Sequence, residues 1–225
     1  MSIVDRIKNI ISSVNPFAHY RRHAMRKKLN NTSPTLLCPN CIGGILFHDL
    51  GLQFRSPTVN LMMYQPDFIK FATNLDHYLS EELHFFQDPN YTCPCAKLDD
   101  ITIHFTHYPT ADVAEKKWND RKSRINPDNL FIFATERDGL TKEDIQRLGT
   151  ISARGILVFT THNYPDIPYT LQIPCFDENG EVGNILKKSI INESRKYEKY
   201  FDFVGWFNEA NGKPYDVSPY AKCNK

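Results

Sequence analysis

The chain has 225 residues, of which 41% are hydrophobic and 24% are charged, and its formal net charge is +1. This length and composition fit one large globular domain or two small ones, with enough apolar residues for a sizeable core. A charge near zero argues against a dedicated nucleic-acid binder, which carries a strong basic excess. No apolar run approaches the ~20 residues needed to cross a bilayer as a helix.

The basic residues gather at the N-terminus. Residues 1–30 contain seven Lys and Arg but only one acid, Asp5. The apolar residues between Ile3 and Val14 recur at helical spacing, which predicts a short amphipathic helix over 3–14. We expect residues 1–30 to make a peripheral contact with an anionic membrane surface. Packing of this helix on the body or on a partner chain is the favoured interpretation of its apolar stripe.

No continuous apolar stretch with a small-residue cleavage site follows the N-terminus, so a signal peptide is not expected. We therefore expect a cytoplasmic protein with reduced cysteines, placed at the inner face of the cell membrane by its basic segment.

Beyond residue 34, short apolar runs alternate with helical patterns. The runs predict strands over 35–38, 59–63, 83–86, 101–105, 130–134, 156–159 and 170–173. The helical patterns cover 43–50, 66–82, 111–125, 141–148 and 200–209. Pro66 suits the first turn of its helix, and Thr110 suits an N-cap position. Thr141 and Asp144 have the spacing of a capping box.

This alternation predicts an α/β fold with three layers, in which helices flank a mostly parallel or mixed sheet. We expect a basic N-terminal segment over 1–30, an α/β domain over 31–210 and an irregular tail over 211–225. The loop 88–96 is a candidate boundary between two small α/β lobes.

One stretch combines glycines with groups that can do chemistry. Gly43 and Gly44 follow a predicted strand and open a predicted helix, whose free N–H groups suit a phosphate. Asn40 and Cys41 come just before them. A helix N-terminus lowers a thiol pKa, so Cys41 is a candidate nucleophile, although a buried structural cysteine is the favoured interpretation.

Two sets of acidic and histidine residues are candidates for acid–base or metal chemistry. His48 and Asp49 are adjacent, but neighbours on a helix point about 100° apart. Asp99 and Asp100 precede a predicted strand, on which Asp100 and His104 share one face. Asp99 and Asp100 could hold a divalent metal, with His104 as base. A solvated strand end is the alternative.

Four cysteines offer a second metal hypothesis. Cys38 and Cys41 have the spacing of a zinc knuckle, while Cys93 and Cys95 are separated by one residue. Because the second spacing is unusual for zinc, four unrelated thiols is the favoured interpretation.

Polar loops also follow two predicted buried strands. Arg137 and Asp138 follow the strand 130–134, and residues 160–165 follow the strand 156–159. Ligands of open α/β sheets bind at this edge. Arg124 and Arg137 are candidates to neutralise a phosphate there, while ordinary turns are the alternative.

These segments together resemble a bacterial family of unknown function whose members are described as exopolysaccharide or capsular polysaccharide biosynthesis proteins. The resemblance rests on residues 40–44, 48–52, 56–61, 97–103, 107–108, 118, 121, 124–126, 129–131, 137–139 and 201–206. It spans about residues 34–209. The family pattern has a longer strand before its Asn-Asn-Cys, where this chain has Pro39 and Asn40.

The resemblance implies an α/β fold and a role in surface-glycan assembly. We expect a glycan-modifying or sugar-nucleotide-dependent transferase, glycosyltransferase-like, that takes a glycan or activated sugar as substrate. Its donor would lie near Asn40, Gly43 and Gly44 together with a divalent metal, and His48, Asp99, Asp100 and His104 would be its catalytic candidates. A non-catalytic partner of the polysaccharide machinery, which binds glycan or protein, is the alternative.

Overall fold

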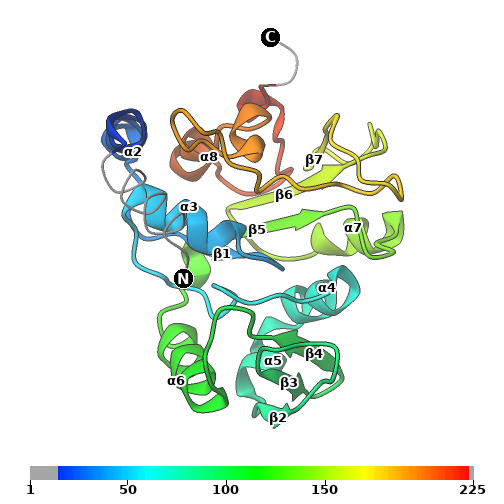
Figure 1. The fold of residues 1–225 in the computed structure, drawn as a ribbon. Coiled ribbons are helices and arrows are strands. Elements are labelled where there is room, and N and C mark those ends of the chain that lie inside the picture. Colours follow the sequence, from blue (N-terminus) through cyan, green and yellow to red (C-terminus); the bar gives the residue numbers. More distant parts are fainter. Residues whose placement is uncertain (1–14, 223–225) are drawn as a thin grey trace.

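A parallel four-stranded sheet forms the centre of the molecule. The computed structural model describes residues 15–222. Its main sheet contains β1 (Thr35–Leu37), β5 (Leu130–Thr135), β6 (Gly155–Thr160) and β7 (Thr170–Gln172), in that order across the sheet. Each strand pairs in parallel with its neighbour, so all four carboxyl ends meet at one edge (Figure 1).

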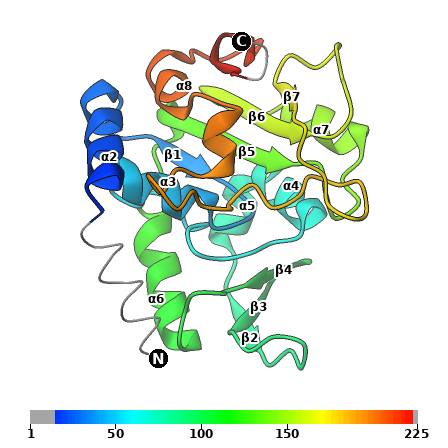
Figure 2. The ribbon, with the colours of Figure 1, turned by 45° about the horizontal axis from the view of Figure 1, so that its top comes forward.

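Both faces of this sheet are covered, which explains why every residue of β5 and β6 is buried. Helices α3 (Ile42–Leu50) and α8 (Phe203–Glu209) lie on one face (Figure 2). There Phe131 of β5 packs against Trp206 and Phe207 of α8. Helices α4 (Gln65–Thr73) and α7 (Lys142–Leu148), which contact each other, complete the third layer.

A small antiparallel sheet packs below α4. It consists of β2 (His84–Phe86), β3 (Cys95–Leu98) and β4 (Ile101–His104). Helices α5 (Leu75–Ser80) and α6 (Ala111–Lys122) flank it (Figure 1). Trp118 of α6 contacts both Phe71 of α4 and Phe105. Residues 87–94 form the loop between β2 and β3, so they join two neighbouring strands of this small sheet.

The N-terminal basic segment contributes helix α2 (Pro16–Lys28), which packs against α3. The Asn15 side chain caps it by accepting hydrogen bonds from the N–H groups of Phe17 and Ala18. The predicted helix over 3–14 lies outside the described residues. None of the helices between residues 15 and 222 is long and apolar enough to span a membrane.

Short 3₁₀ helices (Pro127–Asn129, Lys196–Lys199 and Ser218–Tyr220) complete the elements of the described part. In the C-terminal stretch, Tyr215 is buried and donates its hydroxyl to the carbonyl of Ile151 at 2.5 Å. Apart from the 3₁₀ helix Ser218–Tyr220, the stretch from 211 to 222 is irregular, and it packs on the body of the protein.

The predicted α/β class and the layered arrangement are confirmed. The predicted strand over 59–63 is wrong, because Asn60 adopts a left-handed φ of 64° and only Met62 makes an isolated bridge, to His104. The predicted helix over 66–82 is two helices, since Asn74 leaves the helical region at φ −128° and ψ 45°. Cys95, predicted in a loop, begins β3.

Two helix boundaries also differ from prediction. Helix α6 ends at Lys122 rather than at residue 125. Helix α8 begins at Phe203 rather than at residue 200, because the Asp202 side chain caps it by accepting from the N–H of Gly205.

Candidate functional site

A cavity of about 550 Å³ opens at the carboxyl ends of β1 and β5. Asn40 follows β1 and lines it, and Arg137 and Asp138 follow β5 and line it. Tyr64 and Gln65, at the start of α4, form another wall. Two of the residues predicted to bind a cofactor, Asn40 and Arg137, therefore meet at the sheet edge where α/β proteins bind ligands.

Arg137 is held at the wall of this cavity. It donates to the carbonyl of Val182 at 3.1 Å, and its guanidinium lies 3.4 Å from Asp138 and 3.8 Å from Asp177. The guanidinium carries five N–H groups, so these contacts leave donors for an anionic ligand. Arg124, the other predicted phosphate ligand, instead donates to the carbonyl of Phe54 at 3.4 Å and does not line the cavity.

Gly43 and Gly44 have a packing role in the first turn of α3. A Cβ added to Gly43 would lie 2.5 Å from the Cys38 sulfur, and one added to Gly44 would lie 2.5 Å from Oδ1 of Asn60. Both glycines are buried. The pair thus lets α3 approach β1 and the loop that ends at Asn60, which accounts for the two glycines without a bound phosphate.

The cysteine just before α3 meets a histidine from a distant part of the chain. The Cys41 sulfur lies 3.0 Å from Nε2 of His107, and Cys41 is half-buried whereas His107 is exposed. Cys41 occupies the N-cap position of α3, and it directly follows Asn40 of the cavity wall. A thiol within hydrogen-bond reach of an imidazole is the arrangement of a nucleophile and its base.

The loop that carries His107 is fixed from both sides. Thr106 donates its N–H to the carbonyl of His104 at 3.0 Å. Tyr108 donates its hydroxyl to the carbonyl of Val59 at 2.8 Å, and the buried Arg121 donates both to Tyr108 and to that same carbonyl. His107 is therefore a surface residue on a rigid support.

Burial and a hydroxyl group act in opposite directions on the Cys41 thiol. Burial raises the pKa of Cys41, and the Thr106 hydroxyl lowers it in part. The Thr106 oxygen is itself buried, and no hydrogen-bond partner of normal geometry reaches it from the described residues. The net direction is upward, so the sulfur is a protonated thiol at neutral pH that needs a base to become a nucleophile.

A buried carboxylate that the sequence reasoning missed joins the loops after β5 and β6. Glu136 accepts the hydroxyl of Tyr164 at 2.5 Å, Nδ1 of His162 at 2.8 Å and the N–H of Thr161 at 2.6 Å. Burial opposes its ionisation, but these hydrogen bonds outweigh burial and lower the pKa of Glu136 to about 2. Both loops were predicted at the carboxyl edge of the sheet, but no residue spacing in the sequence distinguished Glu136 from the other polar residues there.

The structure places Asp99 and Asp100 at the turn between β3 and β4, away from the cavity. Asp99 lies 2.9 Å from Nε2 of His77. Asp100 accepts from Nζ of Lys70 at 2.7 Å and from the hydroxyl of Tyr78 at 2.6 Å, and these two contacts lower its pKa. Both carboxylates are exposed, and both already form hydrogen bonds with nearby side chains.

His104 lies at the other end of β4 and is buried. Its ring packs on Tyr91 and Tyr64, and Nδ1 lies 3.4 Å from the Cys95 sulfur. Burial lowers the pKa of His104, which favours the neutral ring. The structure therefore does not bring His104 together with the two aspartates at a common site.

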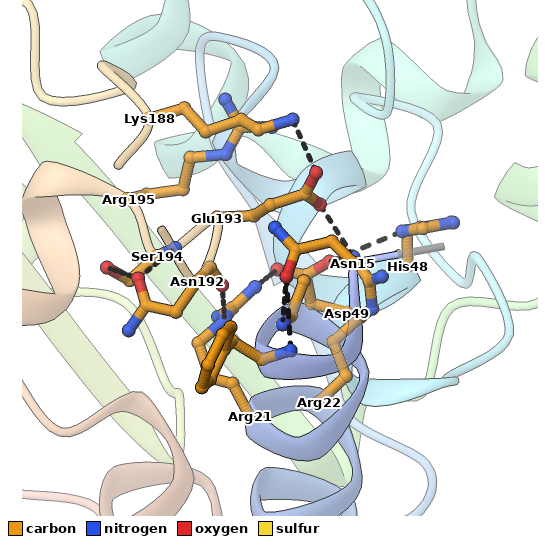
Figure 3. A network of polar contacts seen from close by, with 12 residues as sticks. Asn15, Arg21, Arg22, His48, Asp49, Lys188, Asn192, Glu193, Ser194 and Arg195 are labelled. Carbon is orange, nitrogen blue, oxygen red and sulfur yellow. Dashed lines mark hydrogen bonds and ion pairs between the residues drawn. The ribbon is translucent and has the colours of Figure 1, made fainter. Parts of the chain in front are cut away.

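His48 and Asp49 belong to an ion-pair network rather than to an open site (Figure 3). Asp49 is buried and pairs with Arg21, which also contacts Glu198 at 2.8 Å. His48 is exposed and approaches Asp49 only at 3.4 Å. With Arg21 occupying the carboxylate, Asp49 is poorly placed to orient His48 as a base.

The four cysteines of the zinc hypothesis are not gathered. Cys38 is buried behind Gly43, and burial raises its pKa to about 12. Cys41 faces His107, while Cys95 faces His104 in the small sheet. Within residues 15–222, no group of three or more His, Cys, Asp or Glu side chains is arranged to hold a metal ion.

Two comparisons relate this chain to known proteins. The model of the domain of unknown function DUF1919 matches residues 13–208. An uncharacterized protein of Haemophilus influenzae is 37% identical over 210 residues, which cover 93% of this chain and 100% of that relative. Cys41, His107 and the residues of the cavity all lie within the matched range.

Proposed function

This chain belongs to the DUF1919 family, and we propose that it is a glycan-modifying transferase in which Cys41 carries the transferred group. The observation that carries this proposal is the 3.0 Å contact between the Cys41 sulfur and Nε2 of His107. Neither residue lines the cavity itself, but Cys41 directly follows Asn40 of the cavity wall. Cysteine paired with histidine typically transfers acyl groups through a thioester. The proposed reaction is therefore acyl transfer.

In the first step, Nε2 of His107 takes the proton of Cys41 while the sulfur attacks the carbonyl carbon of an acyl donor. The bond between that carbon and the donor's leaving oxygen or sulfur breaks, and the leaving group takes the proton from His107. The acyl group is then held as a thioester on Cys41.

In the second step, an acceptor hydroxyl gives its proton to His107 and its oxygen attacks the thioester carbon. The bond from carbon to sulfur breaks, the new ester leaves, and the Cys41 thiolate recovers the proton. Cys41 is the N-cap residue of α3, and the positive end of the helix dipole there would stabilise negative charge that develops on its sulfur.

The cavity would bind the rest of the donor. Arg137 at its wall offers N–H groups to a carrier that bears phosphate, although Asp138 and Asp177 line the same cavity and pair with it. The resemblance to exopolysaccharide and capsule biosynthesis proteins supports a surface glycan as the acceptor, at the cytoplasmic face of the membrane. The charge pattern of residues 1–30 supports the same location.

A sugar-nucleotide donor with a divalent metal is less well supported. It depends on Asp99 and Asp100, which do not line the cavity and are bonded to His77, Lys70 and Tyr78. The cavity and Arg137 would also suit a non-catalytic protein that binds a phosphorylated glycan, and the test below separates these functions.

The test follows transfer of a labelled acetyl group from acetyl-coenzyme A, and of a labelled sugar from sugar nucleotides, to surface glycan. We expect acetyl transfer that is lost in Cys41→Ser and reduced about 10²–10⁴-fold in His107→Ala. Cys93→Ser, which alters another half-buried cysteine, is the matched control and should keep full activity. Full transfer by Cys41→Ser would refute the proposal. Glycan binding without transfer of either label would support the non-catalytic partner instead.

A further inference from the structure

Two adjacent isoleucines protrude from the surface near the start of α2. Ile190 is 95% exposed and Ile191 is 71% exposed. Nδ2 of Asn15 donates to the carbonyl of Ile191 at 2.9 Å, which places this loop beside the first turn of α2. There Phe17 is 64% exposed and Tyr20 is 74% exposed, and their spacing puts them on one side of the helix. A group of exposed apolar side chains marks an interaction surface.

The loop that carries the isoleucines is held firmly in place (Figure 3). Arg21 donates to the carbonyl of Asn192 at 3.1 Å. The buried carboxylate of Glu193 pairs with Arg22 at 3.0 Å and with Lys188 at 2.8 Å. These contacts join residues 188–195 to α2, so the protein presents Ile190 and Ile191 on a fixed support.

The two segments that carry these apolar side chains are strongly basic, although Asp202 and Glu209 line a groove together with Phe17 and Tyr20. Residues 15–30 and 187–199 contain ten Lys and Arg but only two acids, Glu193 and Glu198. Both acids are engaged by arginines of α2. Exposed positive charge remains in the last turn of α2, at Arg26, Lys27 and Lys28, and at Lys187 and Lys199.

We propose that Phe17, Tyr20, Ile190 and Ile191 form a tip that enters the surface of an anionic lipid bilayer, with the surrounding lysines and arginines on its headgroups. Apolar and aromatic side chains that sink to the headgroup boundary, together with a basic rim, are the combination that binds anionic membranes. The charge complementarity favours such a bilayer over a protein partner. This inference rests on the membrane location within the proposed function but is independent of Cys41 chemistry.

The experiment measures sedimentation of the full chain with vesicles of phosphatidylcholine alone and of phosphatidylcholine with phosphatidylglycerol. We expect binding to the anionic vesicles only, weakened by salt. The double variant I190S/I191S should bind at least about tenfold more weakly, because burial of two isoleucines stabilises the bound state by more than the ~1.4 kcal/mol that this factor represents. Its melting temperature should equal that of the unchanged protein, since both side chains are exposed.

Matched control variants distinguish binding through the tip from nonspecific binding of exposed apolar or charged residues elsewhere. Phe176→Ser removes another exposed apolar side chain, which is 56% exposed, and should not change vesicle binding. K27E/K28E should weaken binding, whereas K116E/K117E on α6 should weaken it less, although both variants change net charge equally.

Three outcomes would overturn the inference. These are equal binding to neutral and anionic vesicles, full vesicle binding by I190S/I191S, or self-association of the protein through the tip without vesicle binding. Acyl transfer to a soluble glycan is measured separately, so failure of the membrane inference and failure of the proposed catalysis give different results.

Discussion

The sulfur of Cys41 lies 3.0 Å from Nε2 of His107, although 66 positions separate the two residues in the chain. The contact is made by two short loops. One leads from β1 into α3, and the other leaves β4 and is anchored by Tyr108 and the buried Arg121. It pairs a candidate nucleophile with a candidate base next to Asn40 of the cavity wall, and the following predictions test its consequences.

The pH dependence of Cys41 reactivity should show a protonated thiol. Because burial raises the pKa of Cys41, its alkylation by iodoacetamide should still increase above pH ~8.5, the ordinary pKa of a thiol. Residue-resolved mass spectrometry over a pH series measures this rate. A rate that is already constant below pH 7 would indicate a preformed thiolate and would contradict the assignment of His107 as a general base.

The packing of Gly43 against Cys38 predicts a compensating pair of substitutions. Gly43→Ala should lower the free energy of unfolding by about 1–3 kcal/mol, because its Cβ would lie 2.5 Å from the Cys38 sulfur. The double variant G43A/C38A should recover much of this loss, since it removes that sulfur. Denaturant unfolding of the two single variants and the double variant measures the coupling, and additive losses would show that the close approach to Cys38 is not the cause.

Glu136 should make the protein sensitive to acid. Its native pKa of about 2 lies below the value of ~4.3 expected in the unfolded chain, so its stabilising effect is complete above that value and is lost as the pH falls toward 2. The effect amounts to at most roughly 3 kcal/mol. Unfolding measured between pH 7 and pH 2.5 should show a smaller loss of stability in Glu136→Gln than in the unchanged protein. The exposed Glu143, changed to Gln, is the control and should leave the pH dependence as it was.

Arg137 and Asp100 should differ in their effect on ligand binding. Arg137 lines the cavity, so Arg137→Ala should reduce or abolish the thermal shift caused by coenzyme A or another phosphorylated donor. Asp100 lies outside the cavity and pairs with Lys70, so Asp100→Asn should keep that shift. The opposite pattern, with the shift lost only in Asp100→Asn, would favour the metal and sugar-nucleotide hypothesis.

The sequence predicted the layers of this fold because its local signals are strong. The continuous apolar runs of β5 and β6 and the capping box at Thr141 are patterns that a parallel sheet and a helix start produce. Where the backbone departs from local preference, prediction was wrong. Asn60 takes a positive φ, and Asn74 interrupts what reads as one amphipathic helix.

The site was only partly predictable for a different reason. Arg137 was expected at the sheet edge because strand ends can be read from the sequence, and Asn40 was expected near a bound donor because it precedes the glycines that open a helix. The pairs formed by Cys41 with His107 and by Glu136 with His162 depend on tertiary contacts between separate loops, and no spacing rule encodes them. His48 and Asp49 are adjacent in the chain, but the structure pairs Asp49 with Arg21 of α2, a contact between distant segments that the sequence does not encode.

The most direct test of the account is to trap the acyl-enzyme. The protein is incubated with acetyl-coenzyme A, quenched in acid and digested, and each cysteine is examined by mass spectrometry. The account predicts one acetyl group, on Cys41, that hydroxylamine removes and that is greatly reduced in His107→Ala. Acetylation of Cys93 in place of Cys41, or glycan acetylation by a protein whose Cys41 never becomes acylated, would contradict it.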